Sequence, residues 1–302
     1  MHKFRLIMNP GSRSGQGQRL WKTWQSLLHS NRCMLECVPT ESLDHARELA
    51  RTGSGFDAVV AAGGDGTINA VLDGVLLSGN PDLAMGVLYS GTSPDFCRFH
   101  GIPLDPDAAV HALLNTRPKP VDVARITCAD RNGTPVTSHF GCGCNIGLGA
   151  AVARTANRVR RMLGDSLGTG LAVLAALFHE TPVTLTVEHD GIQRTLQNAN
   201  NLSILKNPFI ASGLRLDIGS QSDDGRLTAV AVCGQGPFGL VRTLPGFYTG
   251  RAVHDPAVWI QPCRRIVVQG PTVELEYDGD PHGYLPATVE ILPRALKVLG
   301  VA

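Results

Sequence analysis

A glycine-rich turn between a buried strand and a helix constrains this chain more than any other feature. Residues 58–62 are apolar on both faces of a strand, which is typical of strands inside a parallel sheet. The sequence Gly-Gly-Asp-Gly-Thr follows at 63–67, and apolar side chains then recur at helical spacing from Ile68 to Leu76. This succession predicts a parallel sheet covered by helices, with the turn at the carboxyl edge of the sheet.

The same alternation of strands and helices continues through the first 120 residues. Further strands are expected near 4–8, 33–38 and 84–89, with helical segments between them. Beyond residue 120 the chain changes to short β-branched segments separated by turn residues, and one apolar helix near 165–180 interrupts them.

These patterns predict an α/β protein with two domains. We expect a doubly wound parallel-sheet nucleotide domain over residues 1–121 and a β-rich sandwich domain over residues 122–287. The last segment, 288–302, begins with a strand and could return to the first domain or stay with the second.

Composition excludes several classes of protein. Lys and Arg total 27 and Asp and Glu total 26, so the formal net charge of +1 offers no basic excess for nucleic acid. The eight cysteines contain no Cys-x-x-Cys pair, which argues against a disulfide framework or a zinc site. The apolar start breaks at residue 9, too early for a signal peptide, and no stretch reaches the roughly 20 residues of a membrane span. We therefore expect a cytoplasmic protein.

The turn at 63–67 has the properties of a phosphate-binding loop. Its glycines allow backbone N–H groups to approach a phosphate, and the start of the following helix adds a positive dipole. Asp65 would repel a phosphate unless Mg²⁺ lies between them or the carboxylate positions a nucleophile. The alternative is a tight turn in which Asp65 and Thr67 only cap the helix.

A second loop, at residues 90–96, repeats this geometry after the next strand. Ser93 is suited to the N-cap, Pro94 to the first helical position and Asp95 to the first turn, so Asp95 also has a purely structural interpretation. Both loops would leave the same edge of a parallel sheet. Together they indicate a ligand site better than either does alone.

Several segments together resemble the catalytic domain of the diacylglycerol kinase family, which includes sphingosine and ceramide kinases. The resemblance rests on Gly-Gly-Asp-Gly-Thr-Ile-Asn at 63–69, Gly-Thr-Ser-Pro-Asp-Phe at 91–96 and Gly-Ile-Pro at 101–103. Asn-Pro at 9–10 resembles the family's first phosphate loop. Ser-Asp-Asp-Gly-Arg-Leu at 222–227 and Tyr-Asp-Gly-Asp-Pro at 277–281 are similar to its later acidic loops.

The resemblance implies a nucleotide domain and a β-sandwich domain, with ATP in the cleft between them. The implied nucleotide-binding residues are Asn9, Ser12, Arg13, Gly63, Gly64, Gly66, Thr67, Gly91 and Thr92. Asp65, Asp95 and Asp122 match carboxylates that hold the catalytic Mg²⁺, which phosphoryl transfer needs to neutralise charge on the phosphates.

The resemblance also assigns roles in the second domain. Asp280 stands where the family carries its acidic general base, and Asp278 would lie beside it. Gln221, Asp224 and the Arg226 carbonyl match a structural Mg²⁺ site seen in bacterial members.

Three positions depart from the family pattern. Pro94 replaces a common Asn, Asp280 replaces the usual Glu, and Gly149 stands where a carboxylate is common. The core constellation of residues is still complete.

We expect an ATP- and Mg²⁺-dependent lipid kinase that phosphorylates the hydroxyl of diacylglycerol or a similar lipid. One alternative is a kinase of a sphingoid base, ceramide or NAD, although Asn-Ala-Val at 69–71 and the second loop disfavour an NAD kinase. Another is a nucleotide-binding regulator without turnover, which Pro94 and Gly149 favour.

The expected partners are ATP and a lipid acceptor, met by peripheral contact with the inner membrane face. No nucleic acid is expected, and a homodimer stays open. The basic run of Arg154, Arg158, Arg160 and Arg161 is either a solvated helix face or a patch for anionic headgroups.

Overall fold

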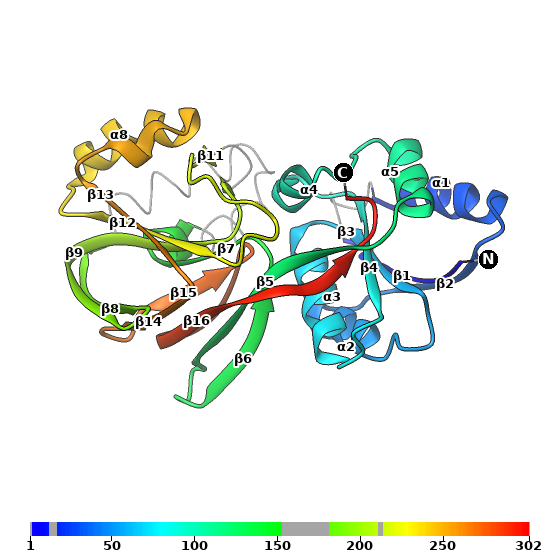
Figure 1. Ribbon diagram of the computed structural model, residues 1–302, viewed down its shortest axis with the longest axis horizontal. Coiled ribbons are helices and arrows are strands. Elements are labelled where there is room, and N and C mark those ends of the chain that lie inside the picture. The colour runs from blue at the N-terminus through cyan, green and yellow to red at the C-terminus, as the bar shows by residue number, and fades with distance from the viewer. Residues whose placement is uncertain (1, 12–16, 153–180, 211–213, 302) are drawn as a thin grey trace. The chain divides into compact units, whose positions relative to one another are not determined.

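Two compact units make up the computed structural model, which describes residues 2–11, 17–152, 181–210 and 214–301. The first unit contains Met1–Val123 and Pro293–Ala302, and the second contains Ala124–Leu292. Figure 1 shows helices and a sheet in the first unit and mostly strands in the second. Ser12, Arg13, the basic run at 154–161 and the helix expected near 165–180 lie outside the described residues.

A parallel sheet forms the centre of the first unit. Its strands are β1 (Lys3–Met8), β2 (Met34–Pro39), β3 (Ala58–Gly63) and β4 (Ala84–Tyr89). They lie in the order β2-β1-β3-β4, all pairs are parallel, and the end of β16 (Asp280–Val298) adds a parallel strand beside β4. Every residue of β3 and β4 is buried, as expected for central strands.

Helices flank this sheet. They are α1 (Gly17–Ser30), α2 (Leu43–Arg51), α3 (Asp65–Leu77), α4 (Asp95–His100) and α5 (Pro106–Asn115). In Figure 1, α2 and α3 lie on one side of the strands, and α1, α4 and α5 lie on the other.

One buried apolar cluster of the first unit forms where α1 and α5 cover the strands. Trp24 and Leu28 of α1 are buried with Phe4 and Leu88 of the sheet. Burying a large apolar side chain of this kind contributes about 1.5–3 kcal/mol. Trp24 and Leu28 thus mark the buried face of α1.

Antiparallel strands build the second unit. They are β5 (Lys119–Ala129), β6 (Pro135–Phe140), β7 (Gly143–Gly147), β8 (Val183–His189), β9 (Ile192–Leu205), β12 (Leu227–Cys233), β13 (Val258–Cys263), β14 (Arg265–Gln269), β15 (Glu274–Tyr277) and most of β16. A short hairpin, β10 (Phe209–Ile210) with β11 (Leu214–Arg215), pairs separately.

Two long strands join the layers of this unit. The first part of β9 pairs with β8, and its second part pairs with β7 and β12. Likewise β16 pairs with both β14 and β15, and β14 pairs with β8. The strand pairing therefore closes on itself around a buried apolar cluster that includes Phe140, Leu202 and Ile266.

The two-domain α/β fold with a β-rich C-terminal domain is confirmed. The sequence patterns did not predict β7, β13 or the helix α8 (Pro237–Thr249). Two glycines bound the five residues of β7, and α8 contains an internal proline, Pro245, which normally argues against a helix. A 3₁₀ turn, η2 (Arg251–His254), follows α8.

Candidate functional site

Two glycine turns at the carboxyl edge of the parallel sheet pack directly against each other. A Cβ added at Gly91 would lie 2.6 Å from the Cα of Gly64, which no side chain tolerates. The Ser90 amide also donates to the carbonyl oxygen of Gly63 at 2.9 Å. A Cβ at Gly63 would meet the Thr67 hydroxyl oxygen at 2.5 Å. The expected adjacency of the two loops therefore depends on glycine at 64 and 91, and glycine at 63 leaves room for Thr67 within the first loop.

Asn9 connects a third loop to the same edge. It follows β1, and its backbone amide donates to the Ala62 carbonyl oxygen at 3.1 Å. Its side-chain Nδ2 donates to Thr67 Oγ1 at 3.1 Å, and its Oδ1 accepts from the Gly11 amide at 2.9 Å. One side chain thus fixes the position of the loop after β1 relative to the start of α3.

Asp65 is the first residue of α3 and lies half-exposed beside these glycines. Its Oδ2 accepts from the Tyr89 hydroxyl at 3.2 Å. Burial and the Asp65 charge together raise the pKa of Tyr89 well above its usual range, so this phenol stays protonated and donates. The same two causes raise the pKa of Cys97. Both groups therefore stay neutral beside the Asp65 carboxylate.

Asp95 is buried at the start of α4 and close to a hydroxyl and a guanidinium. Ser93 Oγ donates to Asp95 Oδ2 at 2.8 Å, and Arg98 lies 3.8 Å from Oδ1. The N-cap is Pro94, without a side-chain cap, so the expected Ser93 cap is wrong by one residue. Because Ser93 bonds the carboxylate instead of the helix amides, it orients Asp95. Thr92 is exposed at this edge.

Asp122 has a structural contact in the first unit. It lies on β5 with 1% of its surface exposed, and its Oδ1 accepts from the Arg294 backbone amide at 2.9 Å. Arg294 has a left-handed φ of 54°, so this hydrogen bond holds a strained residue in the segment that returns to the first unit.

In the second unit, Asp278 holds its own turn together. Its carboxylate accepts from the backbone amides of Gly141, Cys142 and Gly143 at 2.9, 2.9 and 3.0 Å. Asp278 itself has a left-handed φ of 49°. The backbone of Asp280 begins β16 opposite Tyr277, and its side chain lies outside the described part of the chain.

A buried polar row that the sequence patterns did not reveal runs next to this turn. Glu276, Asn145 and Ser203 lie side by side on β15, β7 and β9. Asn145 Nδ2 donates to Glu276 Oε1, and Ser203 Oγ donates to Asn145 Oδ1 at 2.5 Å.

The row reaches a glycine turn at each end. Glu276 Oε2 accepts from the Gly279 amide at 2.8 Å, next to Asp280. At the other end, Asn201 Nδ2 donates to Ser203 Oγ at 2.9 Å, and Asn201 Oδ1 accepts from the Gly149 amide at 2.8 Å. A Cβ at Gly149 would lie 2.7 Å from the Cβ of Asn145, so this turn has no room for the carboxylate that is common in the family.

The acidic loop at 221–226 surrounds a lysine. Asp224 accepts from the backbone amides of Gln221 and Arg226 at 2.9 and 3.0 Å. The fully buried Lys206 places its Nζ 2.6 Å from Asp224 Oδ1 and 3.4 Å from the Arg226 carbonyl oxygen. Within the described residues, no three His, Cys, Asp or Glu side chains gather closely enough to hold a metal ion by themselves.

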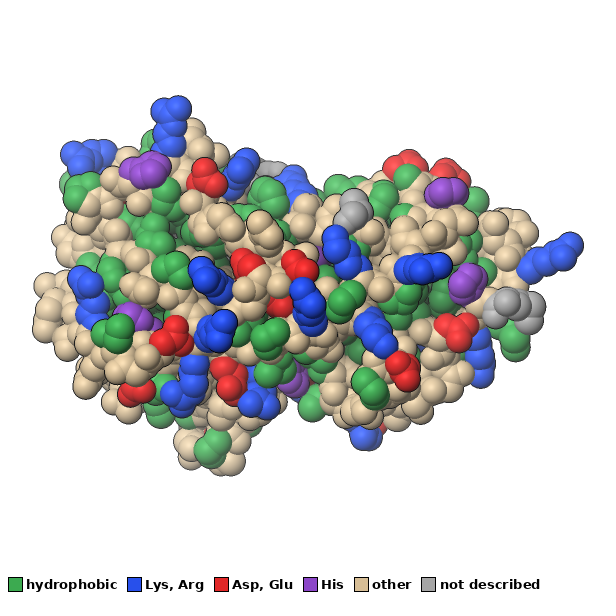
Figure 2. Space-filling view, in the orientation of Figure 1, with side chains coloured by type: hydrophobic (Ala, Val, Ile, Leu, Met, Phe, Trp, Pro, Cys, Tyr) green, Lys and Arg blue, Asp and Glu red, His purple; other side chains and the backbone are tan. Residues whose placement is uncertain are grey.

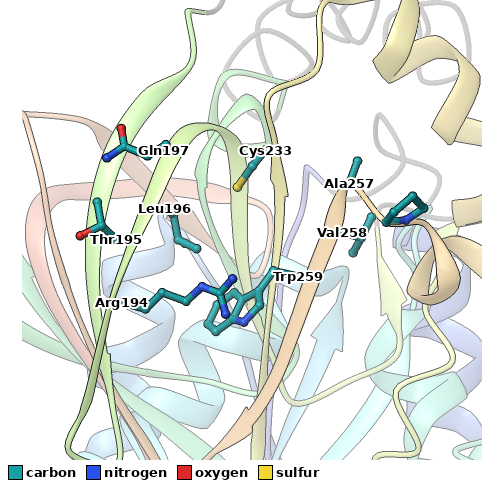
Figure 3. Close-up of a pocket in the computed structure, with 9 residues that line it drawn as sticks. Arg194, Thr195, Leu196, Gln197, Cys233, Ala257, Val258 and Trp259 are labelled. Carbon is teal, nitrogen blue, oxygen red and sulfur yellow. The ribbon is translucent and has the colours of Figure 1, made fainter.

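A separate pocket of about 320 Å³ lies between β9 and β13 (Figure 3). Arg194 and Trp259 line it, and the guanidinium carbon lies 5.4 Å from the ring centroid, which is a cation–π contact. None of the site residues expected from the sequence line this pocket.

Comparison with known families gives one match over most of each unit, and the second match also includes residues 293–300 of the first unit. Residues 3–126 match the family described as diacylglycerol kinase catalytic domain. Residues 143–300 match the family described as YegS C-terminal NAD kinase beta sandwich-like domain. The chain belongs to the diacylglycerol kinase family of lipid kinases. It is therefore an enzyme, a phosphotransferase, as expected from the resemblance of its loops.

Individual relatives cover nearly the whole chain. A diacylglycerol kinase of Mycobacterium tuberculosis is 28% identical over 90% of this chain and 86% of its own. One of Bacillus subtilis is 27% identical over 99% of this chain and 96% of its own. The crystal structure of a diacylglycerol kinase from Bacillus anthracis superposes with a TM-score of 0.70 at 17% identity, covering 99% and 96% of the two chains.

Among the residues that the structure describes, no helix is both long and apolar enough to cross a bilayer.

Proposed function

We propose that this kinase transfers the γ-phosphate of ATP to the hydroxyl of diacylglycerol or a similar lipid and requires Mg²⁺ for the transfer. The observation that carries the proposal is the pair of interlocked glycine turns at the carboxyl edge of the parallel sheet, with Asp65 at the start of α3. Ligands of open parallel sheets bind at this edge.

The nucleotide phosphates are proposed to lie on the loops after β1, β3 and β4. Gly64 and Gly66 are half-exposed there, and neither has a Cβ to block a phosphate. Asn9 supports this surface through its hydrogen bond to Thr67. Thr92 is exposed at this edge and is a further proposed phosphate contact. We also propose that Ser12 and Arg13 bind the nucleotide.

The residues at this edge fit a nucleotide-bound Mg²⁺. Mg²⁺ usually binds through one or two carboxylates together with phosphate oxygens and water, so a cage of three or more acidic side chains is unnecessary. Asp65 and Asp95 supply two carboxylates at neighbouring helix starts. When bound, the ion would neutralise charge on the transferring phosphoryl group. We leave Asp122 out of this set, because it is buried and bonded to Arg294.

We assign the acceptor chemistry to the turn at 278–280. Asp280 is the proposed general base that takes the proton from the lipid hydroxyl. The Asp278 clamp and the Glu276 hydrogen bond to Gly279 fix the backbone of this turn. Asp278 is thus a positioning residue, since its carboxylate is occupied by three amides.

The acceptor defines the main alternatives. The second unit matches a domain described as NAD kinase beta sandwich-like, which favours NAD as a second candidate acceptor. A regulator that binds nucleotide without turnover is the other alternative. The kinase would reach a lipid acceptor by peripheral contact with a membrane. Whether it forms a homodimer is tested by analytical ultracentrifugation.

The proposal is tested by incubating the protein with ATP, Mg²⁺ and a panel of diacylglycerol, ceramide, sphingoid base and NAD. We expect ADP release that depends on diacylglycerol and a mass increase of the lipid by one phosphoryl group. Nucleotide binding without turnover on any acceptor would identify a regulator, and turnover on NAD alone would identify an NAD kinase.

Asp65→Asn tests the metal assignment. We expect a loss of activity of about 100-fold or more, because charge neutralisation at the phosphates is lost, with a melting temperature close to that of the unsubstituted protein. Asp107→Asn is the matched control, since Asp107 is an exposed aspartate in the first turn of α5 in the same unit. Full activity in Asp65→Asn would refute the assignment.

A further inference from the structure

Lys206 is the one lysine that stands among the largest fully buried side chains of the described residues. It follows the end of β9, and its ammonium lies against Asp224, just before β12 begins. The two strands pair antiparallel with Leu205 opposite Thr228, so Lys206 lies at the end of the β9–β12 pairing, next to the loop that carries Asp224. A buried ammonium requires such a partner, because an unpaired buried charge costs several kcal/mol.

The partners of this ammonium are groups that the family resemblance assigned to Mg²⁺. They are the Asp224 carboxylate at 2.6 Å and the Arg226 carbonyl oxygen at 3.4 Å. Gln221, the third expected ligand, donates its backbone amide to Asp224.

A divalent ion does not fit this arrangement. Mg²⁺ demands about six oxygen ligands in octahedral geometry, at about 2.0–2.1 Å. The Lys206 ammonium occupies the space beside Asp224 Oδ1 and would repel a second cation there.

We propose that the Lys206 ammonium is the resident cation of the loop at 221–226, and that this loop folds without a divalent metal ion. The lysine neutralises the Asp224 carboxylate. Its ammonium also donates hydrogen bonds to the two oxygens, on Asp224 and Arg226, that would otherwise coordinate a metal ion. The metal requirement of the enzyme is then confined to the nucleotide site of the first unit.

Thermal unfolding without nucleotide tests this proposal. The unsubstituted protein and Asp224→Asn are compared in millimolar Mg²⁺ and in EDTA. Any ion bound at the first unit raises the melting temperature of both proteins equally. The informative quantity is therefore the difference between the two proteins in the rise of melting temperature from EDTA to Mg²⁺. We expect this difference to be zero. A stabilisation by Mg²⁺ that disappears in Asp224→Asn would overturn the proposal.

Lys206→Met gives the second arm. It keeps the length of the side chain and removes the charge, so we expect the melting temperature to fall by about 5–10 °C, as for a broken buried ion pair. In the double variant Lys206→Met/Asp224→Asn the losses should be clearly less than additive. Additive losses would show that the two side chains act independently and would overturn the proposal. If Lys206→Met does not fold, the Asp224→Asn comparison still decides.

A different observation concerns the solvent face of α8. Phe238, Val241 and Tyr248 are 85%, 46% and 61% exposed, and Pro245 is exposed between them. At 3.6 residues per turn, these four residues lie on one side of the helix. Its other side is used internally, since Phe247 packs on the small cluster that contains Leu205 and Leu216. Large apolar side chains gathered on an exposed face mark an interaction surface.

Charge selects the partner of this face. The stretch from α8 through η2 carries Arg242, Arg251 and His254 and contains no acidic residue. In Figure 2, basic side chains stand over the region of α8. The nearest acidic residues along the chain are Asp224, which is paired with Lys206, and Asp255, whose Oδ1 accepts from the Ala257 amide.

We infer that α8 lies flat on an anionic lipid surface, with Phe238, Val241 and Tyr248 at the acyl boundary and Arg242 among the headgroups. Aromatic and apolar residues beside arginine are the composition of interfacial helices. With 13 residues, α8 is shorter than the roughly 20 that span a bilayer. This inference rests on the proposed function, because a lipid acceptor requires such a surface.

Sedimentation with vesicles of phosphatidylglycerol and phosphatidylcholine tests this inference. Phe238→Ser/Tyr248→Ser should lower the bound fraction about fivefold or more, because the buried apolar area is lost. Ile192→Ser is the matched control, since Ile192 is also 61% exposed in the same unit, and it should bind like the unsubstituted protein. Unchanged binding of the double variant would overturn the inference. A loss of dimers in the double variant with unchanged vesicle binding would identify a second copy as the partner and overturn it too.

Activity separates this inference from the proposed function. On short-chain diacylglycerol dispersed in detergent, the double variant should match the unsubstituted kinase, and on vesicles it should be slower. If neither protein phosphorylates any lipid, the proposed function fails, while the sedimentation result still decides whether α8 binds membranes.

Discussion

Acidic loops in the two units of this protein look alike in sequence but are built differently. In the first unit, Asp65 and Asp95 follow glycine turns whose backbones are in van der Waals contact. In the second unit, backbone amides hold the carboxylates: Asp224 accepts from two amides and from Lys206, and Asp278 accepts from three amides. The comparison teaches that an Asp-Gly motif predicts a turn, whereas the partners of its carboxylate decide between a ligand site and a structural role.

The largest effect that sharpens this contrast is expected at Asp278. Asp278→Asn keeps the size of the side chain and leaves it a single oxygen acceptor for three amides. We expect the free energy of unfolding to fall by about 3 kcal/mol, because hydrogen bonds to a charged group are the stronger ones. Chemical denaturation followed by circular dichroism measures the change. A fully stable Asp278→Asn that had lost all activity would instead make Asp278 catalytic.

A Cβ between the two glycine turns should lower activity more than stability, the reverse of the effect expected for Asp278→Asn. Gly91→Ala would place a methyl group 2.6 Å from Gly64, so the loops must separate. We expect kcat/KM for ATP to fall about tenfold, with a smaller loss of stability. Gly55→Ala is the control, since its nearest neighbour is the Lys3 side chain at 3.9 Å, and it should behave like the unsubstituted protein. Equal kinetics in the two variants would mean that the contact is irrelevant to the nucleotide.

The polar row of the second unit should respond more weakly. Ser203→Ala leaves Asn145 Oδ1 without its hydroxyl donor in a buried position. We expect a loss of about 1–2 kcal/mol in the free energy of unfolding, the cost of an unsatisfied buried acceptor. Because Asn201 also bonds Ser203, the Gly149 turn should exchange its amide hydrogen faster, as measured by hydrogen exchange. Unchanged stability and exchange would contradict a continuous network.

The smallest expected effect is a pH dependence. Burial raises the pKa of Cys128 to about 11, above the usual value of 9.0. The thiol therefore loses its proton at a lower pH in the unfolded chain than in the folded one. The free energy of unfolding is unaffected below pH 9 and falls between pH 9 and 11. At pH 10 the loss is about 1 kcal/mol. In Cys128→Ala, the free energy of unfolding should fall less steeply over this pH range, as measured by chemical denaturation at several pH values. An unchanged slope would mean that other groups cause the pH dependence.

Local signals account for what could be predicted. The glycine turns, the strands before them and the helix starts after them depend on neighbours in sequence, so residues 58–77 and 84–96 could be placed without a structure. The partners in the second unit could not, because they depend on strand register. Asn145 and Glu276 are 131 residues apart, and neither shows a pattern of its own. Lys206 likewise has no sequence signal that connects it to Asp224.

Two elements misled the sequence patterns for a different reason. Proline and glycine argue against a helix, yet α8 begins with Pro237 and carries Pro245 within it. A proline in the first turn costs nothing, since the N–H it lacks would be unpaired there anyway. The short strand β7 contains two glycines among its five residues and is held by neighbours on both sides, β9 and β15. Tertiary pairing therefore outweighs its weak local preference.

The return of residues 293–302 to the first unit makes that unit discontinuous in sequence. A fragment that stops at Val123 would lack the last strand beside β4, where Lys297 and Val298 pair with Ala84 and Met85. Such a fragment would expose an apolar strand edge that can recruit other chains into aggregates. No single proteolytic cut can therefore release the first unit intact, and the whole β-rich unit has the position of a long insertion between the paired strands β5 and β16.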